Sequence, residues 1–126
     1  MPDSAYLHEP AKSLSKRTID RHRALESIQE ELQAVDWYDQ RVEATSDPEL
    51  AALLAHNRDE EKEHAAMLLE WLRRNDSGFD RHLRTYLFTT ASITTLESGA
   101  TSDGPRAKTA SPDESLGIGS LKAVKA

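Results

Sequence analysis

The chain has 126 residues and no cysteine, and its 16 Lys and Arg against 22 Asp and Glu give a formal net charge of −6. The length allows one domain, and the lack of cysteine excludes a disulfide framework, a thiolate metal site and a cysteine nucleophile. The acidic balance argues against nucleic acid as a partner and is compatible with attracting cations.

The N-terminal segment carries no sign of targeting or of regular structure. It lacks the basic and apolar regions of a secretory signal, and no run of 18 apolar residues occurs in the chain. Residues 1–12 contain Pro2 and Pro10 and no periodicity, which predicts an arm outside the folded domain. We therefore expect a cytoplasmic protein without a membrane partner.

Two long helices joined by a tight turn dominate the pattern. A stretch without Gly or Pro runs from about Ser13 to about Thr45. Its apolar residues are spaced by threes and fours, which predicts a helix of about thirty residues. Asp47 is a natural N-cap, and Pro48 suits the first position of a second helix that runs to about Arg74. The sequence therefore predicts an antiparallel helical hairpin of the all-α class.

A third, shorter helix is predicted after the hairpin. The second helix is expected to end with a left-handed cap at Asn75 or Gly78, and the third to run from about Phe79 to Phe88. A weaker turn is predicted around Ile93 to Glu97. Together with the hairpin, these elements give a helical domain over residues 13–97.

The last part of the chain is expected to lie outside that domain. Residues 98–115 are rich in Ser, Thr, Gly, Asp, Pro and Ala, a composition typical of a disordered linker. Three aliphatic residues then follow, spaced by small ones, in Leu116-Gly117-Ile118-Gly119-Ser120-Leu121-Lys122. Such a segment at the end of a tether indicates a short linear motif for a groove on another protein, with a frayed tail as the alternative.

The chemistry is concentrated in Glu61-x-x-His64, in the middle of the second helix. A carboxylate and an imidazole three residues apart share a helical face and can bind one metal ion. The pair falls on the apolar stripe, where an unpaired carboxylate is costly, so we expect a cation to neutralise it. With the turn near Ser46, Glu31 and Glu61 each lie about 22 Å from the turn and face one another.

These three residues amount to half of a dinuclear site. Ferritin-like di-iron bundles take a Glu from each of two helices and Glu-x-x-His from each of the other two. A second copy related by a twofold axis would complete a four-helix bundle, with two Glu31, two Glu61 and two His64 around two metal ions. The ligand types suit redox iron, two ions per pair of chains, while zinc, or manganese with peroxide chemistry, stays open.

Other residues near this face are candidates for supporting roles. Tyr38 lies seven residues after Glu31, where its hydroxyl can donate a hydrogen bond or serve as a reserve ligand in catalysis, and Trp37 lies beside it. Both also suit a core position. Glu30, with Gln33, can gather cations or be plain solvated surface. The remaining histidines (His8, His22, His56 and His82) are expected at the surface or in packing. A salt-bridge face is predicted from Arg23, Asp36, Asp39, Arg41 and Lys62.

Three blocks of sequence closely resemble the encapsulated ferritins. They are Glu-Glu-x-x-Ala-Val-Asp-Trp-Tyr at residues 30–38, His-Asn-Arg-Asp-Glu-Glu-Lys-Glu-His at residues 56–64, and Glu-Trp-Leu-Arg-Arg at residues 70–74. The segment at residues 116–122 resembles the peptide by which such cargo docks inside an encapsulin nanocompartment. The resemblance covers about residues 21–93 and this tail.

The resemblance implies a two-helix protein that pairs to form a ferroxidase centre and assembles into a ring of ten chains. Glu31, Glu61 and His64 would be the iron ligands, with Trp37 and Tyr38 close by. The protein would oxidise Fe(II) and pass Fe(III) to the encapsulin lumen for mineral storage. The family pairs two Glu where metal enters, and here one of them, next to Glu30, is replaced by Gln33.

A rival hypothesis belongs to a different class of protein. It is a non-enzymatic helical dimer, an adaptor that docks to a partner through its C-terminal peptide. This adaptor would bind no stoichiometric metal and would assemble equally well with a chelator.

Overall fold

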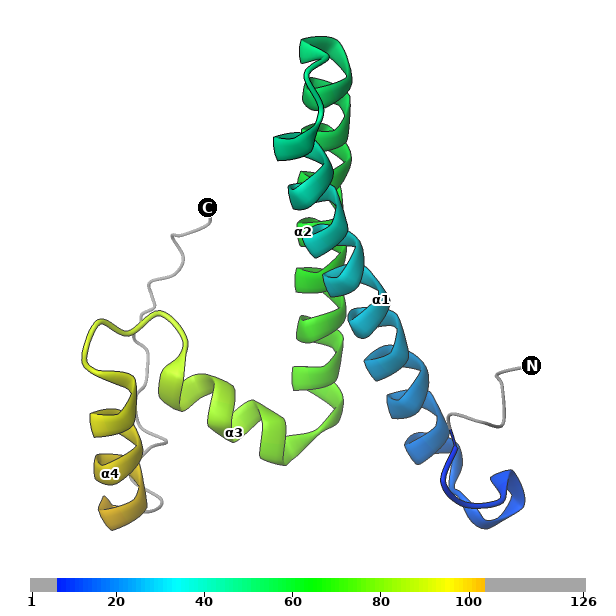
Figure 1. Ribbon diagram of the computed structural model, residues 1–126. Helices are drawn as coiled ribbons and strands as arrows, with labels where there is room; N and C mark the ends of the chain where they lie inside the picture. Colours follow the sequence, from blue (N-terminus) through cyan, green and yellow to red (C-terminus); the bar gives the residue numbers. More distant parts are fainter. Residues whose placement is uncertain (1–6, 104–126) are drawn as a thin grey trace. The chain divides into compact units, whose positions relative to one another are not determined.

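The computed structural model describes residues 7–103, with side chains over residues 7–99. Every element of regular secondary structure found there is a helix. A short 3-10 helix (η2, Ala11–Ser13) precedes four α-helices, as Figure 1 shows: α1 (Lys16–Ala44), α2 (Pro48–Asn75), α3 (Ser77–Tyr86) and α4 (Ile93–Asp103). The predicted all-α class is confirmed. The described residues fall into two compact units, with the division between Asn75 and Asp76.

Side-chain caps define the two helix starts of the hairpin. The Ser15 hydroxyl accepts a hydrogen bond from the Thr18 N–H at 3.1 Å, so α1 begins just after Ser15. The Asp47 carboxylate accepts from the N–H groups of Glu49 and Leu50 at 3.0 and 3.3 Å, which confirms the predicted cap of α2. Such caps satisfy backbone donors that have no partner within the helix. The chain therefore reverses direction within a short turn.

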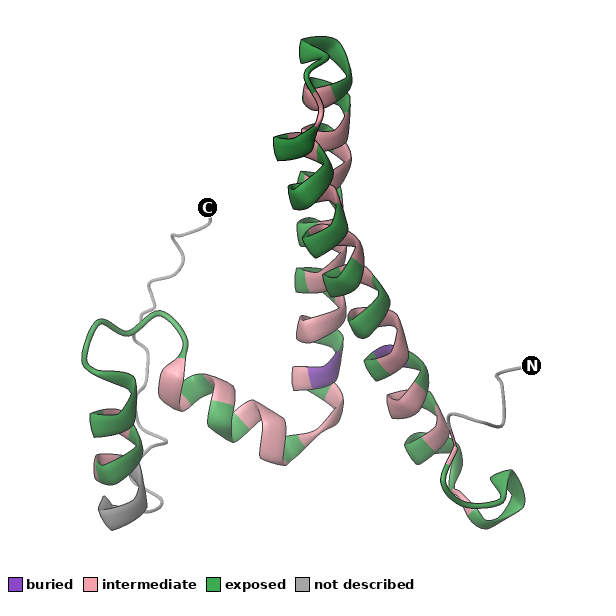
Figure 2. Cartoon of the chain, in the orientation of Figure 1, coloured by how far each residue is buried: buried purple, intermediate pink, exposed green. Residues whose placement is uncertain are grey.

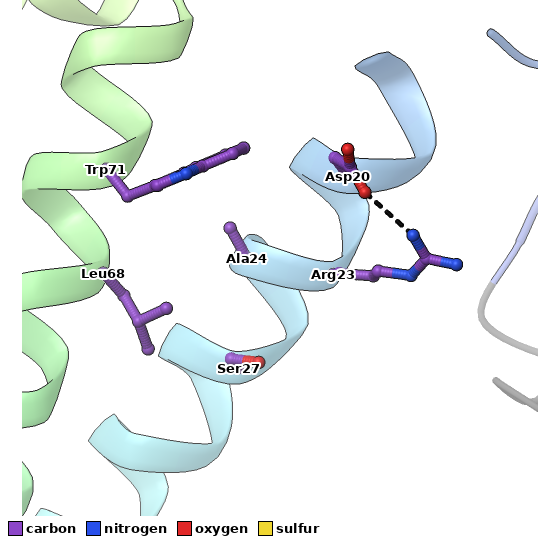
Figure 3. A pocket seen from close by; sticks show the side chains of 6 residues that line it. All are labelled: Asp20, Arg23, Ala24, Ser27, Leu68 and Trp71. Carbon is purple, nitrogen blue, oxygen red and sulfur yellow. Dashed lines mark hydrogen bonds and ion pairs between the residues drawn. The ribbon is translucent and has the colours of Figure 1, made fainter. Parts of the chain in front are cut away.

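The two helices of the hairpin pack against each other at the end far from the turn. Ala24 of α1 and Leu72 of α2 are 7% and 1% exposed, and they are the buried apolar residues among those the structure describes (purple in Figure 2). Figure 3 shows Leu68 and Trp71 of α2 facing Ala24, whose small side chain leaves room for them. The Arg21 guanidinium donates to the Asn75 carbonyl at 3.1 Å and ties the two helix ends together.

Large apolar side chains of both helices stay exposed in the single chain. Leu32 of α1 is 55% exposed, and Leu53 and Met67 of α2 are 55% and 57% exposed. Other exposed apolar residues of the hairpin are Leu25, Trp37, Leu50 and Trp71. Helices of this length gain most of their stability from burying an apolar face, and here a large part of that face remains uncovered.

The expected left-handed cap at the end of α2 is wrong. Asp76 instead caps α3 at once, accepting a hydrogen bond from the Phe79 N–H at 3.0 Å, and its backbone is extended, with φ −151°. Gly78 therefore lies in the first turn of α3 and needs no positive φ. Among the described residues other than glycine, a positive φ occurs at Phe88, beyond α3, where it is 61°.

The fourth helix is longer than predicted. The sequence indicated a turn around Ile93 to Glu97 and a linker from residue 98, but α4 continues to Asp103. The Ser98 hydroxyl donates to the Thr94 carbonyl at 3.4 Å, so this serine takes a hydrogen-bond partner inside α4. The rest of the predicted linker and the peptide at residues 116–122 lie outside the described residues. No described helix is long and apolar enough to cross a membrane.

A cluster of ion pairs near the end of α2 makes the stability of the fold depend on pH. Arg73 and Arg74 donate to the Glu70 carboxylate at 2.8 and 2.7 Å and lower the pKa of Glu70 from 4.5 to about 2. Glu70 thus stabilises the fold above pH 4.5, and the stabilisation is lost as the pH falls towards 2. Because its side chain is 43% exposed, we expect Glu70→Gln to cost about 0.5–1 kcal/mol of unfolding free energy at pH 7.

Chemical unfolding followed by circular dichroism at several pH values tests this prediction. The difference between wild type and Glu70→Gln should shrink below pH 4.5. Glu43→Gln, at an exposed glutamate near the other end of the hairpin, is the matched control. A Glu70→Gln difference that stays constant from pH 7 to pH 3 would contradict the assignment.

Candidate metal centre

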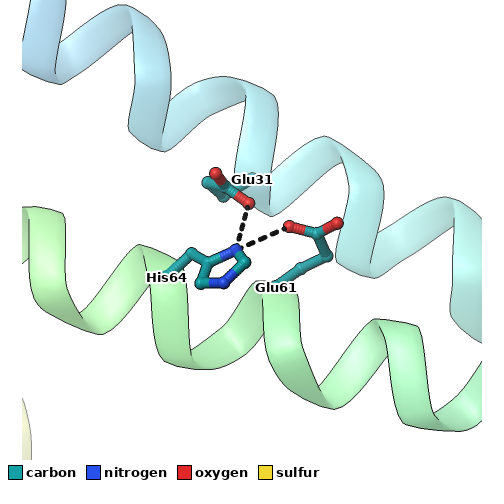
Figure 4. A group of neighbouring side chains, drawn as sticks. All are labelled: Glu31, Glu61 and His64. Carbon is teal, nitrogen blue, oxygen red and sulfur yellow. Dashed lines mark hydrogen bonds and ion pairs between the residues drawn. The ribbon is translucent and has the colours of Figure 1, made fainter.

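Three side chains from both long helices meet in the middle of the hairpin. Figure 4 shows Glu31 of α1 and Glu61 of α2 converging on the His64 ring. The His64 Nδ1 atom lies 3.3 Å from a Glu61 carboxylate oxygen and 3.6 Å from a Glu31 carboxylate oxygen. One ligand atom from each residue lies within 4.8 Å of the others. The structure thus brings together the three residues that the sequence predicts as metal ligands.

Helix periodicity and hairpin register explain this convergence. Glu61 and His64 are three residues apart and therefore share one face of α2. Arg58 of α2 donates to Asp39 of α1 at 2.9 Å on the turn side of the cluster, and the bond between Arg21 and Asn75 lies on the open side. These two cross-helix contacts lie on either side of the cluster, in the register that places Glu31 at the level of His64.

The geometry fits a bound divalent ion. Two ligand atoms about 2.1 Å from one ion are about 3.0–3.4 Å apart, for octahedral and tetrahedral angles. The observed separations from His64 Nδ1, 3.3 and 3.6 Å, are close to this range. Two carboxylates and one imidazole suit iron, manganese or zinc. The Glu31, Glu61 and His64 side chains are 24%, 25% and 44% exposed, so solvent and further ligands can reach the ion.

Mutual hydrogen bonding and charge shift the titration of all three groups. Hydrogen bonding with Glu61, together with burial, raises the pKa of Glu31, whereas hydrogen bonds to Glu31 and His64 lower the pKa of Glu61. The hydrogen bond to Glu61 and the charges of both carboxylates raise the pKa of His64. Because metal ligands must be ionised carboxylates and neutral imidazole, a metal ion competes with protons for this cluster.

Three residues were candidates for supporting roles near the cluster: Trp37, Tyr38 and Glu30. The Arg41 guanidinium stacks 5.5 Å from the Tyr38 ring centre, and Trp37, 47% exposed, borders a shallow depression with Gln40 and Arg41. Glu30 is exposed. Within the part of the chain that the structure describes, Glu30 does not belong to the convergent group of carboxylates and imidazole. Their predicted roles stay predictions.

The other histidines and charged residues partly follow the sequence predictions. His56 contacts Glu60 at 3.4 Å on the surface, as its surface assignment predicted. The predicted salt-bridge face is partly confirmed, because Arg23 pairs with Asp20 at 2.8 Å. The sequence did not point to Arg58 of α2, which donates to Asp39 of α1 and so joins the two helices. Spacing along α2 places Arg58 on the face of Glu61, but its bond to Asp39 is a contact between helices that local spacing does not predict.

The helical hairpin and its Glu and His cluster define a ferritin-like protein with a candidate metal site. The profile of the EncFtn-like family matches residues 6–90, and the chain belongs to this family. It is 61% identical over 121 residues to the encapsulated ferritin-like protein of Rhodospirillum rubrum, across 91% of this chain and 86% of the relative. The predicted resemblance to encapsulin-associated ferritin-like proteins is therefore confirmed.

Further relatives agree with this assignment. The ferritin-like protein of Thermotoga maritima is 58% identical over 90 residues, 71% of this chain and 79% of the relative. The encapsulin nanocompartment cargo protein EncC of Myxococcus xanthus is 30% identical over 103 residues, 76% of this chain and 79% of the relative. A crystal structure of a Nitrosomonas europaea protein matches with a TM-score of 0.66 and 63% identity, covering 68% of this chain and 94% of that one.

The titration of the cluster predicts how metal binding depends on pH. Because the pKa of His64 is raised and metal binding needs the neutral imidazole, affinity for Co²⁺ should fall as the pH is lowered from 8 to 6. His64→Gln should weaken Co²⁺ binding by at least about tenfold and flatten this pH dependence. Absorption titrations with Co²⁺ measure both.

His56→Gln is the matched control for this experiment. His56 lies on the same helix and also contacts a glutamate, but it is outside the cluster. Its variant should bind Co²⁺ as the wild type does. Equal losses in the two variants would mean that Co²⁺ binds elsewhere.

Proposed function

We propose that this protein is a ferroxidase that oxidises Fe(II) to Fe(III) with dioxygen at a di-iron centre formed between two chains. The convergence of Glu31, Glu61 and His64 carries the proposal, because this ligand set is half of what a ferritin-like di-iron centre needs. Membership of the EncFtn-like family supports an iron-related role.

A second copy of the chain is the natural source of the other half. The three ligands are 24–44% exposed, so each retains an accessible side in the single chain. Leu32, next to Glu31, and Met67, one turn after His64, are 55% and 57% exposed. A twofold-related hairpin would cover these apolar side chains and bring a second ligand set to the first. We propose that such pairs assemble further into a ring of ten chains.

The proposed reaction treats Fe(II) as the substrate. Each iron would be held by Glu31, Glu61 and His64, with carboxylates shared between the two ions. Two Fe(II) ions each give one electron to dioxygen, which takes up two protons and leaves at the level of hydrogen peroxide. A pair of irons avoids release of a one-electron product, and the carboxylates favour Fe(III).

The flanking residues have proposed supporting roles. Glu30 is exposed and acidic, so it can attract Fe(II) before the ion reaches the centre. Gln33 lacks the charge that a second carboxylate would supply there. Tyr38 is proposed to donate a hydrogen bond to the completed centre, and Trp37 to lie close to it.

We further propose that the protein acts inside an encapsulin nanocompartment in the cytoplasm. The Rhodospirillum rubrum relative is named an encapsulated ferritin-like protein, and the Myxococcus xanthus relative a nanocompartment cargo protein. The peptide at residues 116–122 would dock to the shell, and Fe(III) would pass to the lumen for storage. This segment lies outside the described residues.

Initial rates of Fe(II) oxidation test the proposed activity. Glu61→Ala or His64→Ala should reduce the rate to that of free Fe(II), because each removes a ligand from both half-sites of a pair. Glu60→Ala, at the exposed neighbour of Glu61, is the control and should keep the wild-type rate. Oxygen and iron should be consumed together.

Two outcomes would overturn the ferroxidase assignment. One is a normal initial rate in the Glu61 and His64 variants. The other is a wild-type rate no faster than free Fe(II), together with consumption of hydrogen peroxide by the manganese-loaded protein, which would point to di-manganese peroxide chemistry instead.

A further inference from the structure

Arg58 is held by two aspartates beside the candidate metal centre. Its guanidinium donates to Asp39 of α1 at 2.9 Å and to Asp59 of its own helix at 3.1 Å. The Arg58 side chain is 23% exposed, whereas those of Asp39 and Asp59 are 53% and 61% exposed. Hydrogen bonding to the Asp59 and Asp39 carboxylates raises the pKa of Arg58.

The position of Arg58 also brings it near a third carboxylate, that of Glu61. Arg58 and Glu61 are three residues apart on α2 and therefore neighbours on one face of the helix. An arginine can form an ion pair with a glutamate at this spacing. Such a pair would engage the same carboxylate oxygens that a metal ion needs, and it would place a positive charge next to the cation site.

We propose that Asp39 and Asp59 are positioning residues that hold the Arg58 guanidinium away from Glu61 and so keep this carboxylate available to metal. The inference rests on the proposed function, since it assigns Glu61 as an iron ligand. It adds residues outside the ligand cluster to the determinants of metal affinity. Asp39 acts from α1, so the hairpin register itself contributes to withholding the cation.

A purely structural role makes a different prediction. The bond between Arg58 and Asp39 joins α1 to α2, and its loss would loosen the hairpin whichever partner is removed. On that account, Arg58→Gln and Asp39→Asn should weaken metal binding equally. On our account they differ, because removing the aspartates releases a competing cation, whereas removing the arginine releases none.

The experiment measures Co²⁺ affinity by absorption titration of the full chain at pH 7.5. Asp39→Asn/Asp59→Asn should bind Co²⁺ about two- to fivefold more weakly than the wild type, the range expected for competition from a partly exposed ion pair. Adding Arg58→Gln to this double variant should restore wild-type affinity. Arg58→Gln alone should bind at least as tightly as the wild type.

Two internal controls sharpen the comparison. Lys62, 3.9 Å from Asp59, also loses a partner in the double variant, but it remains in the triple variant, so recovery there assigns the effect to Arg58. Thermal unfolding and native mass of all variants report loss of hairpin stability independently of metal. The affinity loss should also shrink as salt is raised, because it arises from charge.

The failures of the two proposals are distinguishable. If wild type and His64→Gln bind Co²⁺ equally, the metal centre itself is wrong. If the wild type binds through His64 but the double aspartate variant matches it, the positioning role is wrong and the metal centre stands. An affinity in Arg58→Gln as low as in the double variant, or no recovery in the triple variant, also overturns the positioning role.

Discussion

The register between α1 and α2 is the constraint on which the site depends. Glu31 belongs to α1, whereas Glu61 and His64 belong to α2. The contact between His64 and Glu31 at 3.6 Å exists because the antiparallel helices align, while that between His64 and Glu61 at 3.3 Å follows from their spacing on α2. The caps at Ser15 and Asp47 set where each helix begins. Moving either helix by one residue relative to the other would rotate Glu31 by about 100° away from His64.

The single chain leaves both its apolar surface and its candidate metal centre partly uncovered. Among the described residues, Ala24 and Leu72 are the buried apolar ones, while large apolar groups of both helices stay exposed. The candidate metal centre is likewise partly open. In the proposed function, a second copy would cover the exposed apolar groups and complete the ligand set, because both lie on the same hairpin. Assembly and metal binding should therefore be linked.

Much of this organisation could be predicted from sequence, because it is governed by local rules. Periodicity gave the two long helices, the Asp47-Pro48 pair gave the turn, and spacing from that turn placed Glu31 opposite Glu61. The errors came where several local signals compete. Gly78 suggested a left-handed cap, but Asp76 capped a new helix first. Ser98 was assigned to a linker, yet its hydroxyl bonds within α4. Arg58 was missed because its role depends on Asp39, a contact between helices.

The central claim is that one chain carries half of a dinuclear centre. Native mass spectrometry, first on metal-stripped protein and then after anaerobic addition of Fe(II), reads assembly and iron content together. We predict two irons per pair of chains and a shift towards larger assemblies when iron binds. A monomer that binds a full pair of irons, or a fixed oligomer that binds none, would contradict the shared centre.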